Sequence, residues 1–193
     1  LNLNHWKSVV LMKVVNVVVK TKEQIIDKVA QYLHWLTIPK TEINNMPICP
    51  FIQPELSQDN LYTDVWYPEQ NTFMQLMEDY LLSGKNSALF ICPDTDTIDY
   101  SEVSRSDIQK KILKLLRANP QTEHLKALCM SPHEPWELAG IDTRKSSPYF
   151  LINIVPSKQL SKAHKDLQKT KYFNNYTDED RKKMKVFESE KKA

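Results

Sequence analysis

The sequence is poor in glycine. Only Gly84 and Gly140 occur among its 193 residues. The phosphate-binding loops of Walker and dinucleotide type both need several closely spaced glycines, because the backbone must approach a phosphate. The chain therefore lacks both of these routes to nucleotide binding.

Cysteine is also scarce. Cys49, Cys92 and Cys129 are odd in number and widely spaced, without a Cys-x-x-Cys pair, so neither a disulfide framework nor a zinc ribbon is expected. The five histidines lack the paired helical spacing of zinc enzymes. We therefore expect no metal site and a reducing, cytoplasmic location. The sequence leaves the cofactor unknown.

Long apolar runs are absent as well. The valine-rich stretch at 9–19 is interrupted by Lys13 and Asn16 and falls short of the roughly 20 residues that span a bilayer. It has no small-residue cleavage site, and its β-branched residues favour a strand. We expect a soluble protein without a transmembrane segment, in which residues 1–20 form an apolar leader or an edge strand.

The charge is nearly balanced overall but uneven along the chain. The net charge is +2, yet residues 158–193 hold eleven Lys or Arg against six Asp or Glu. Such runs are usually solvated helix faces, and no aromatic residues are interleaved as in nucleic-acid-binding motifs. Nucleic acid is thus an unlikely partner, although an electrostatic nucleic-acid or membrane-surface binder remains an alternative.

The polar and apolar residues recur at helical spacing in five segments. Thr-x-x-Gln capping boxes at Thr21 and Thr72 mark the starts of two of them. For the third we expect a cap at Asp99 or Ser101, with Leu115 in its buried stripe. The predicted helices cover about 22–37, 73–84, 102–118, 157–167 and 178–190.

Strand patterns alternate with these helices. The segments 61–66, 87–92, 125–130 and 149–155 are predicted strands, and 38–60 is predicted to be an irregular connection. The alternation indicates right-handed crossovers and at least partly parallel pairing. We predict an α/β (or α+β) fold: a single layered domain with a central mixed or mostly parallel sheet of about four or five strands flanked by helices. Its core would span 21–170, with a charged C-terminal helix or tail at 171–193.

Three loop motifs concentrate reactive residue types: Cys-Pro-Phe at 49–51, His-Glu-Pro-Trp-Glu-Leu-Ala-Gly at 133–140 and Ser-Pro-Tyr at 147–149. Ligands of layered α/β sheets usually bind beyond the carboxyl ends of the strands. His133 follows a predicted buried strand directly, which places it near a candidate cleft.

Three side chains are candidate catalytic groups. Cys49 could be a thiol nucleophile, a redox group or a soft metal ligand, or only a small buried hydrophobe. His133 could be a general acid or base, or a loop histidine packed on Trp136. Tyr149 could orient a substrate or cap a loop. The candidate substrate-binding residues are Arg144, Trp136, Ser147, Asn153 and Phe51.

The three motifs together resemble a bacterial family of α/β proteins known only as a domain of unknown function. That family carries Leu-Cys-Pro-Phe, a His-Pro-Asp-Tyr-Gln-Phe-Ala-Gly-like segment and Arg-Ser-Pro-Tyr-Pro, which residues 48–51, 133–140 and 146–150 match in part. The resemblance covers about 22–185 and implies the fold and the place of a site, but no reaction. Ser146, Phe150 and Asn153 replace an arginine, a proline and a histidine of the family pattern, so the same ligand cannot be assumed.

The resemblance joins Cys49, His133 and Tyr149 into one predicted small-molecule pocket, within about 5 to 8 Å of one cavity. One hypothesis is a thiol-dependent or acid/base enzyme, with Arg144 positioning the substrate. The alternative is a non-catalytic ligand- or peptide-binding protein that uses the same pocket. The sequence does not determine the oligomeric state.

Overall fold

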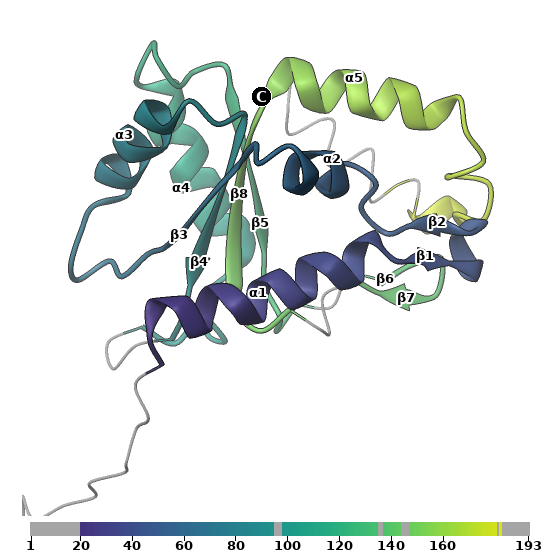
Figure 1. The fold of residues 1–193 in the computed structure, drawn as a ribbon, viewed down its shortest axis with the longest axis horizontal. Helices are drawn as coiled ribbons and strands as arrows, with labels where there is room; N and C mark the ends of the chain where they lie inside the picture. The colour runs from purple at the N-terminus through teal and green to yellow at the C-terminus, as the bar shows by residue number, and fades with distance from the viewer. Residues whose placement is uncertain (1–19, 95–97, 135–136, 144–146, 181, 183–193) are drawn as a thin grey trace, which may run out of the picture.

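The computed structural model describes residues 20–94, 98–134, 137–143, 147–180 and 182. It is an α+β fold in which helices cover both faces of a mixed four-stranded sheet, as the sequence predicted (Figure 1). The helices are α1 (Lys22–Thr37), α2 (Ile52–Ser57), α3 (Phe73–Ser83), α4 (Arg105–Arg117) and α5 (Ser157–Gln168), with a 3-10 turn at Thr41–Ile43. The strands are β1 (Pro39–Lys40), β2 (Met46–Pro47), β3 (Leu61–Val65), β4 (Ser87–Cys92), β5 (Leu125–Met130), β6 (Glu137–Leu138), β7 (Ile141–Asp142) and β8 (Phe150–Pro156).

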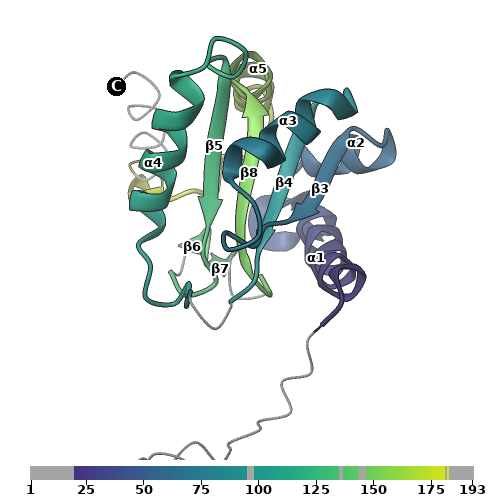
Figure 2. The ribbon, with the colours of Figure 1, turned by 90° about the vertical axis from the view of Figure 1, so that its left-hand side faces the viewer.

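The main sheet has the strand order β3-β4-β8-β5. β3 and β4 are parallel, and β8 runs antiparallel between β4 and β5. Figure 2 shows the arrowheads of β5 and β8 at opposite ends of the sheet. The carboxyl ends of β3, β4 and β5 therefore share one edge with the start of β8, and we call this the carboxyl edge.

The sheet separates two apolar cores. On one face, α3 and α4 pack against Phe90, Phe150 and Ile152. On the other face, α1 packs against Leu89, Ile91 and Leu151, together with residues that follow α5. Figure 2 shows α1 and α4 on opposite sides of the sheet. The alternation of β8 side chains between the two cores explains why this strand is buried on both faces.

The ends of the helices follow the predicted capping chemistry. Thr21 and Thr72 each accept a hydrogen bond from the backbone N–H three residues later, and the Gln at that position reaches back to complete the capping box. Gly84 ends α3 in the left-handed conformation. Each cap satisfies backbone groups that the helix cannot bond internally.

Several local predictions need correction. The 38–60 connection contains the β1–β2 pair and α2, so it is not wholly irregular. Ser104, and neither Asp99 nor Ser101, caps α4, and Leu115 is 44% exposed rather than buried.

The structure describes the predicted N-terminal leader and the predicted last helix only in part. Thr177 caps a helical turn at 178–180, through reciprocal hydrogen bonds with Asp180. The rest of the predicted last helix and residues 1–19 of the predicted leader lie outside the described residues. Tyr172 and Tyr176 are buried against the α1-side core, so the core continues past residue 170.

Candidate functional site

Cys49 lies beyond the C-terminal end of α1. Its backbone N–H donates to the carbonyl of Leu36, 3.1 Å away, and its side chain packs against the α1-side core. The hydroxyl of Tyr172 donates to the carbonyl of the preceding residue, Ile48. The Cys-Pro-Phe motif thus closes the apolar core where α1 ends, and Phe51 packs there as well.

Burial controls the chemistry of this thiol. Desolvation raises the pKa of Cys49 above its ordinary value, although backbone N–H groups of Phe51 and Ile52 act in the opposite direction. A thiolate nucleophile needs a lowered pKa. The environment of Cys49 therefore suits the small-hydrophobe interpretation of this residue.

Tyr149 lies at the carboxyl edge, directly before β8. Its hydroxyl accepts a hydrogen bond from the ammonium of Lys20, 3.3 Å away, and the same ammonium lies 5.5 Å from the centre of its ring. The hydroxyl of Ser147, which is buried, donates to the Tyr149 carbonyl at 2.8 Å. Ser147 therefore fixes the backbone that presents Tyr149.

The length of α1 separates Tyr149 from Cys49. Tyr149 contacts Lys20, just before the helix begins, whereas Cys49 bonds to Leu36 near its end. A 16-residue helix is about 24 Å long at 1.5 Å per residue. The Lys20 backbone and the Leu36 carbonyl, which anchor the partners of Tyr149 and Cys49, therefore lie near opposite ends of α1, while both side chains pack against the α1-side core.

His133 lies at the carboxyl edge but points to different neighbours. Its backbone N–H donates to the hydroxyl of Ser131, and its side chain is exposed. The pKa of Asp99 is lowered chiefly by hydrogen bonds from Ser101, with a smaller contribution from His133. Asp99 precedes Tyr100, which belongs to the core on the α3 and α4 side. Tyr149, by contrast, packs against the α1-side core.

The remaining predicted binding residues have separate environments. Asn153 is half-buried in the middle of β8, opposite Leu89 and Leu128 in the neighbouring strands. Arg144 and Trp136 lie outside the described residues. The 133–140 motif contains β6 and leads into β7.

A polar cluster at the carboxyl edge was not predicted. It consists of Lys20, Lys22, Asp64, Tyr67 and Tyr149, and we call it the edge cluster. Lys22 forms an ion pair with Asp64 at 2.6 Å, and the Asp64 side chain is only 14% exposed. Burial raises the pKa of Tyr67, and nearby Tyr149 and Glu69 raise it further. The cluster thus connects the start of α1 with the carboxyl end of β3 and the start of β8.

A third cationic side chain, Lys28, comes from the second turn of α1 and lies near the edge cluster. The positive charge of the nearby Lys20 ammonium lowers the pKa of Lys28. The hydrogen bond with Tyr149 raises the pKa of Lys20. Within the described residues, Lys20 has a phenol and another ammonium as side-chain partners, and no carboxylate. The place is electrostatically suited to an anion.

The sequence held only a weak signal for this cluster. Lys20 and Lys22 flank the capping residue Thr21, where they look like ordinary solvated charges. Asp64 and Tyr67 come from the end of β3, and only the topology brings them to the start of α1. The pairing of distant segments was not encoded in any local spacing.

The described residues contain no group of three or more His, Cys, Asp or Glu side chains that could hold a metal ion. Over the same part of the chain, each helix is either too short or too polar to cross a lipid bilayer.

Comparison of the chain with protein-family models finds no match, and searches of curated proteins and of solved structures find no significant match. The resemblance to the bacterial family of unknown function therefore rests on the three motifs that carry it.

Proposed function

We propose that this protein binds a small anionic molecule at the edge cluster, as a non-catalytic binding protein of a reducing, cytoplasmic compartment. The observation that carries the proposal is the position of Lys20, whose ammonium contacts the Tyr149 hydroxyl and lies against Lys28. A carboxylate or phosphate bound there would accept hydrogen bonds from both ammonium groups. It would also remove the repulsion between them.

The neighbouring groups support the same ligand chemistry. The phenol of Tyr149 can donate to an anion once Lys20 turns toward the ligand. Lys22 is already neutralised by Asp64, so this pair would hold the start of α1 in place. The location agrees with the general preference of ligands for the carboxyl ends of sheet strands.

Thiol-dependent catalysis is not supported by this geometry. The raised pKa of Cys49 lowers the fraction of thiolate, and α1 separates this residue from Tyr149. Of the two functions predicted from the sequence, ligand binding is therefore the better supported, with Tyr149 as its retained residue.

The proposal predicts that Lys20→Gln weakens anion binding. Isothermal titration calorimetry with inorganic phosphate and with succinate would measure the affinity. Losing one charge-assisted hydrogen bond costs about 1.5 kcal/mol or more, which corresponds to an affinity roughly ten-fold lower. Tyr149→Phe should cause a smaller loss, because it removes one neutral donor.

Lys85→Gln is the matched control. Lys85 is paired with Asp59 at 2.5 Å and lies beside the starts of β3 and β4, at the opposite edge of the sheet. This variant changes the net charge equally and should bind both anions like the parent. An unchanged affinity in Lys20→Gln, or an equal loss in Lys85→Gln, would contradict the proposal.

A further inference from the structure

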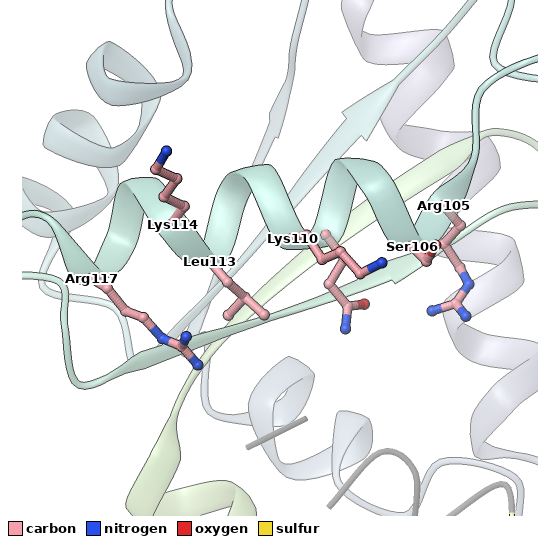
Figure 3. Close-up of a pocket in the computed structure, with 7 residues that line it drawn as sticks. Arg105, Ser106, Lys110, Leu113, Lys114 and Arg117 are labelled. Carbon is pink, nitrogen blue, oxygen red and sulfur yellow. The ribbon is translucent and has the colours of Figure 1, made fainter. Parts of the chain in front are cut away.

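The outer face of α4 carries a cationic groove that the proposed ligand site does not use. Its volume is about 380 Å³, and its described lining comes from α4 alone (Figure 3). The lining residues are Arg105, Ser106, Gln109, Lys110, Leu113, Lys114 and Arg117. Four of these seven side chains are cationic, and none is acidic.

The charges of the groove are only partly compensated. Arg105 pairs with Glu134 at 3.2 Å. Lys110 lies 3.8 Å from Asp107, in a pair so exposed that its net contribution to stability is small. For Lys114 and Arg117, no ion pair with a described carboxylate occurs. Two turns of α4, about 10 Å of helix, thus present three cations toward solvent.

An apolar side chain lies between the charges. Leu113 is half-buried and lies three residues after Lys110 and four before Arg117. Figure 3 shows these three side chains on the same side of α4, with Lys114 on its opposite edge. Lys110, Leu113 and Arg117 therefore form a row along one side of the helix, with the leucine between the two cations.

We propose that this groove binds an acidic amphipathic helix of a partner protein. Such a helix carries carboxylates at i and i+7 with a leucine between them, and it matches the row of Lys110, Leu113 and Arg117 in charge, polarity and spacing. A nucleic acid offers phosphates but no aliphatic side chain for Leu113. Moreover, α4 has no aromatic residue on which a base could stack. The observations therefore favour the peptide.

The test uses a fluorescein-labelled peptide of about 14 residues, four helical turns, with glutamates at i and i+7 and leucine at i+4. Fluorescence anisotropy measures its binding to the full chain. The double variant Lys110→Gln with Arg117→Gln should weaken binding at least about ten-fold, since two desolvated ion pairs are lost. Both substitutions are at solvent-exposed charges, and a thermal melt checks that the variant remains folded.

The matched control removes the same charge from another basic helix face. On α5, Lys162 and Lys165 line a second cationic surface with serines and without an apolar side chain. Lys162→Gln with Lys165→Gln should change the peptide affinity less than about two-fold, because the net charge alone steers association weakly. Equal losses in the two double variants would overturn the proposal.

Two further probes distinguish the kind of partner. A peptide with serine in place of leucine should bind at least about five-fold more weakly than the parent peptide, since it loses the contact with Leu113. A single-stranded oligothymidylate of similar charge should bind more weakly than the amphipathic peptide. Equal binding of the serine peptide, or tighter binding of the oligonucleotide, would overturn the assignment of an acidic helix.

Discussion

At the scale of single residues, the surroundings of a side chain decide its chemistry more than its type does. The Cys49 thiol lies near the hydroxyls of Tyr172 and Tyr176, in the core that α1 covers. Burial raises the pKa of Tyr176 to about 12 and raises that of the Cys49 thiol as well. An ordinary cysteine has a pKa of about 8.5, so the thiolate of Cys49 is rarer than that of a free cysteine at neutral pH.

We therefore predict slow thiol labelling of the folded protein. At pH 7.5 fewer than about one tenth of Cys49 side chains would be thiolate, and the other two cysteines are buried. Labelling with a chromogenic disulfide reagent should be at least about ten-fold slower than in urea-unfolded protein. The folded Cys49→Ser variant should label as slowly as the parent. A fast phase that disappears in Cys49→Ser would instead identify a reactive thiol.

At the scale of elements, the 133–140 motif is explained in part by a tight turn. Ala139 and Gly140 connect β6 to β7, and both have positive φ angles, 50° and 78°. Two consecutive left-handed residues are typical of a type I′ hairpin turn. Only glycine adopts this conformation without strain, so the glycine of this motif has a conformational role.

The turn predicts opposite effects for two substitutions. Gly140→Ala should lower the free energy of unfolding by about 1 to 2 kcal/mol, because a β-carbon disfavours the left-handed conformation. Apart from the two chain neighbours of Gly140, no described residue has a heavy atom within 4 Å of the position of that added carbon. We therefore expect the loss to come from the backbone angle. Ala139→Gly should be neutral or stabilising by up to about 1 kcal/mol. Urea denaturation measures both.

The exposed Ala30 of α1 serves as the control for the added glycine. Ala30→Gly should lower the free energy of unfolding by about 1 kcal/mol, since glycine disfavours a helix interior. If Ala139→Gly destabilises the protein as much as Ala30→Gly, the strain assigned to Ala139 is absent.

Regular elements were predictable because their signals are local. The capping boxes at Thr21 and Thr72 and the apolar run of β4 each lie within a few residues. The prediction failed where tertiary contacts decide, as with Leu115, whose helical spacing suits a buried stripe. The short β1–β2 pair has only two residues in each strand, too few to give a period.

At the scale of the whole molecule, topology determines which loops can meet. The sequence indicated a layered sheet, but not that β8 lies antiparallel between β4 and β5. This insertion puts Tyr149, just before β8, and His133, in the loop after β5, at the same edge of the sheet. The sequence predicted the helix at 22–37, but it carried no information on which end of that helix each motif contacts.

The segment after α5 completes the core on the α1 side. We therefore predict that removing the hydroxyl of a tyrosine in this segment destabilises the protein more than removing that of Tyr149. The hydroxyl of Tyr172, which is buried, donates to the carbonyl of Ile48 across 124 residues of sequence. Tyr172→Phe would leave this carbonyl unpaired in the core and should lower the free energy of unfolding by about 1 to 3 kcal/mol. Tyr149→Phe should cost less than about 0.5 kcal/mol, because its partner Lys20 is exposed and water can replace the hydrogen bond.

Urea denaturation of both variants tests how far the C-terminal segment belongs to the cooperative unit. A loss confined to Tyr172→Phe would show that residues near 172 unfold together with α1 and the sheet, because only then does the hydrogen bond contribute to global stability. Equal, small effects in both variants would mean that this segment detaches before the sheet unfolds. The fold would then end near residue 170, and the core around Cys49 would be open to solvent in the detached state, where its thiol would label quickly.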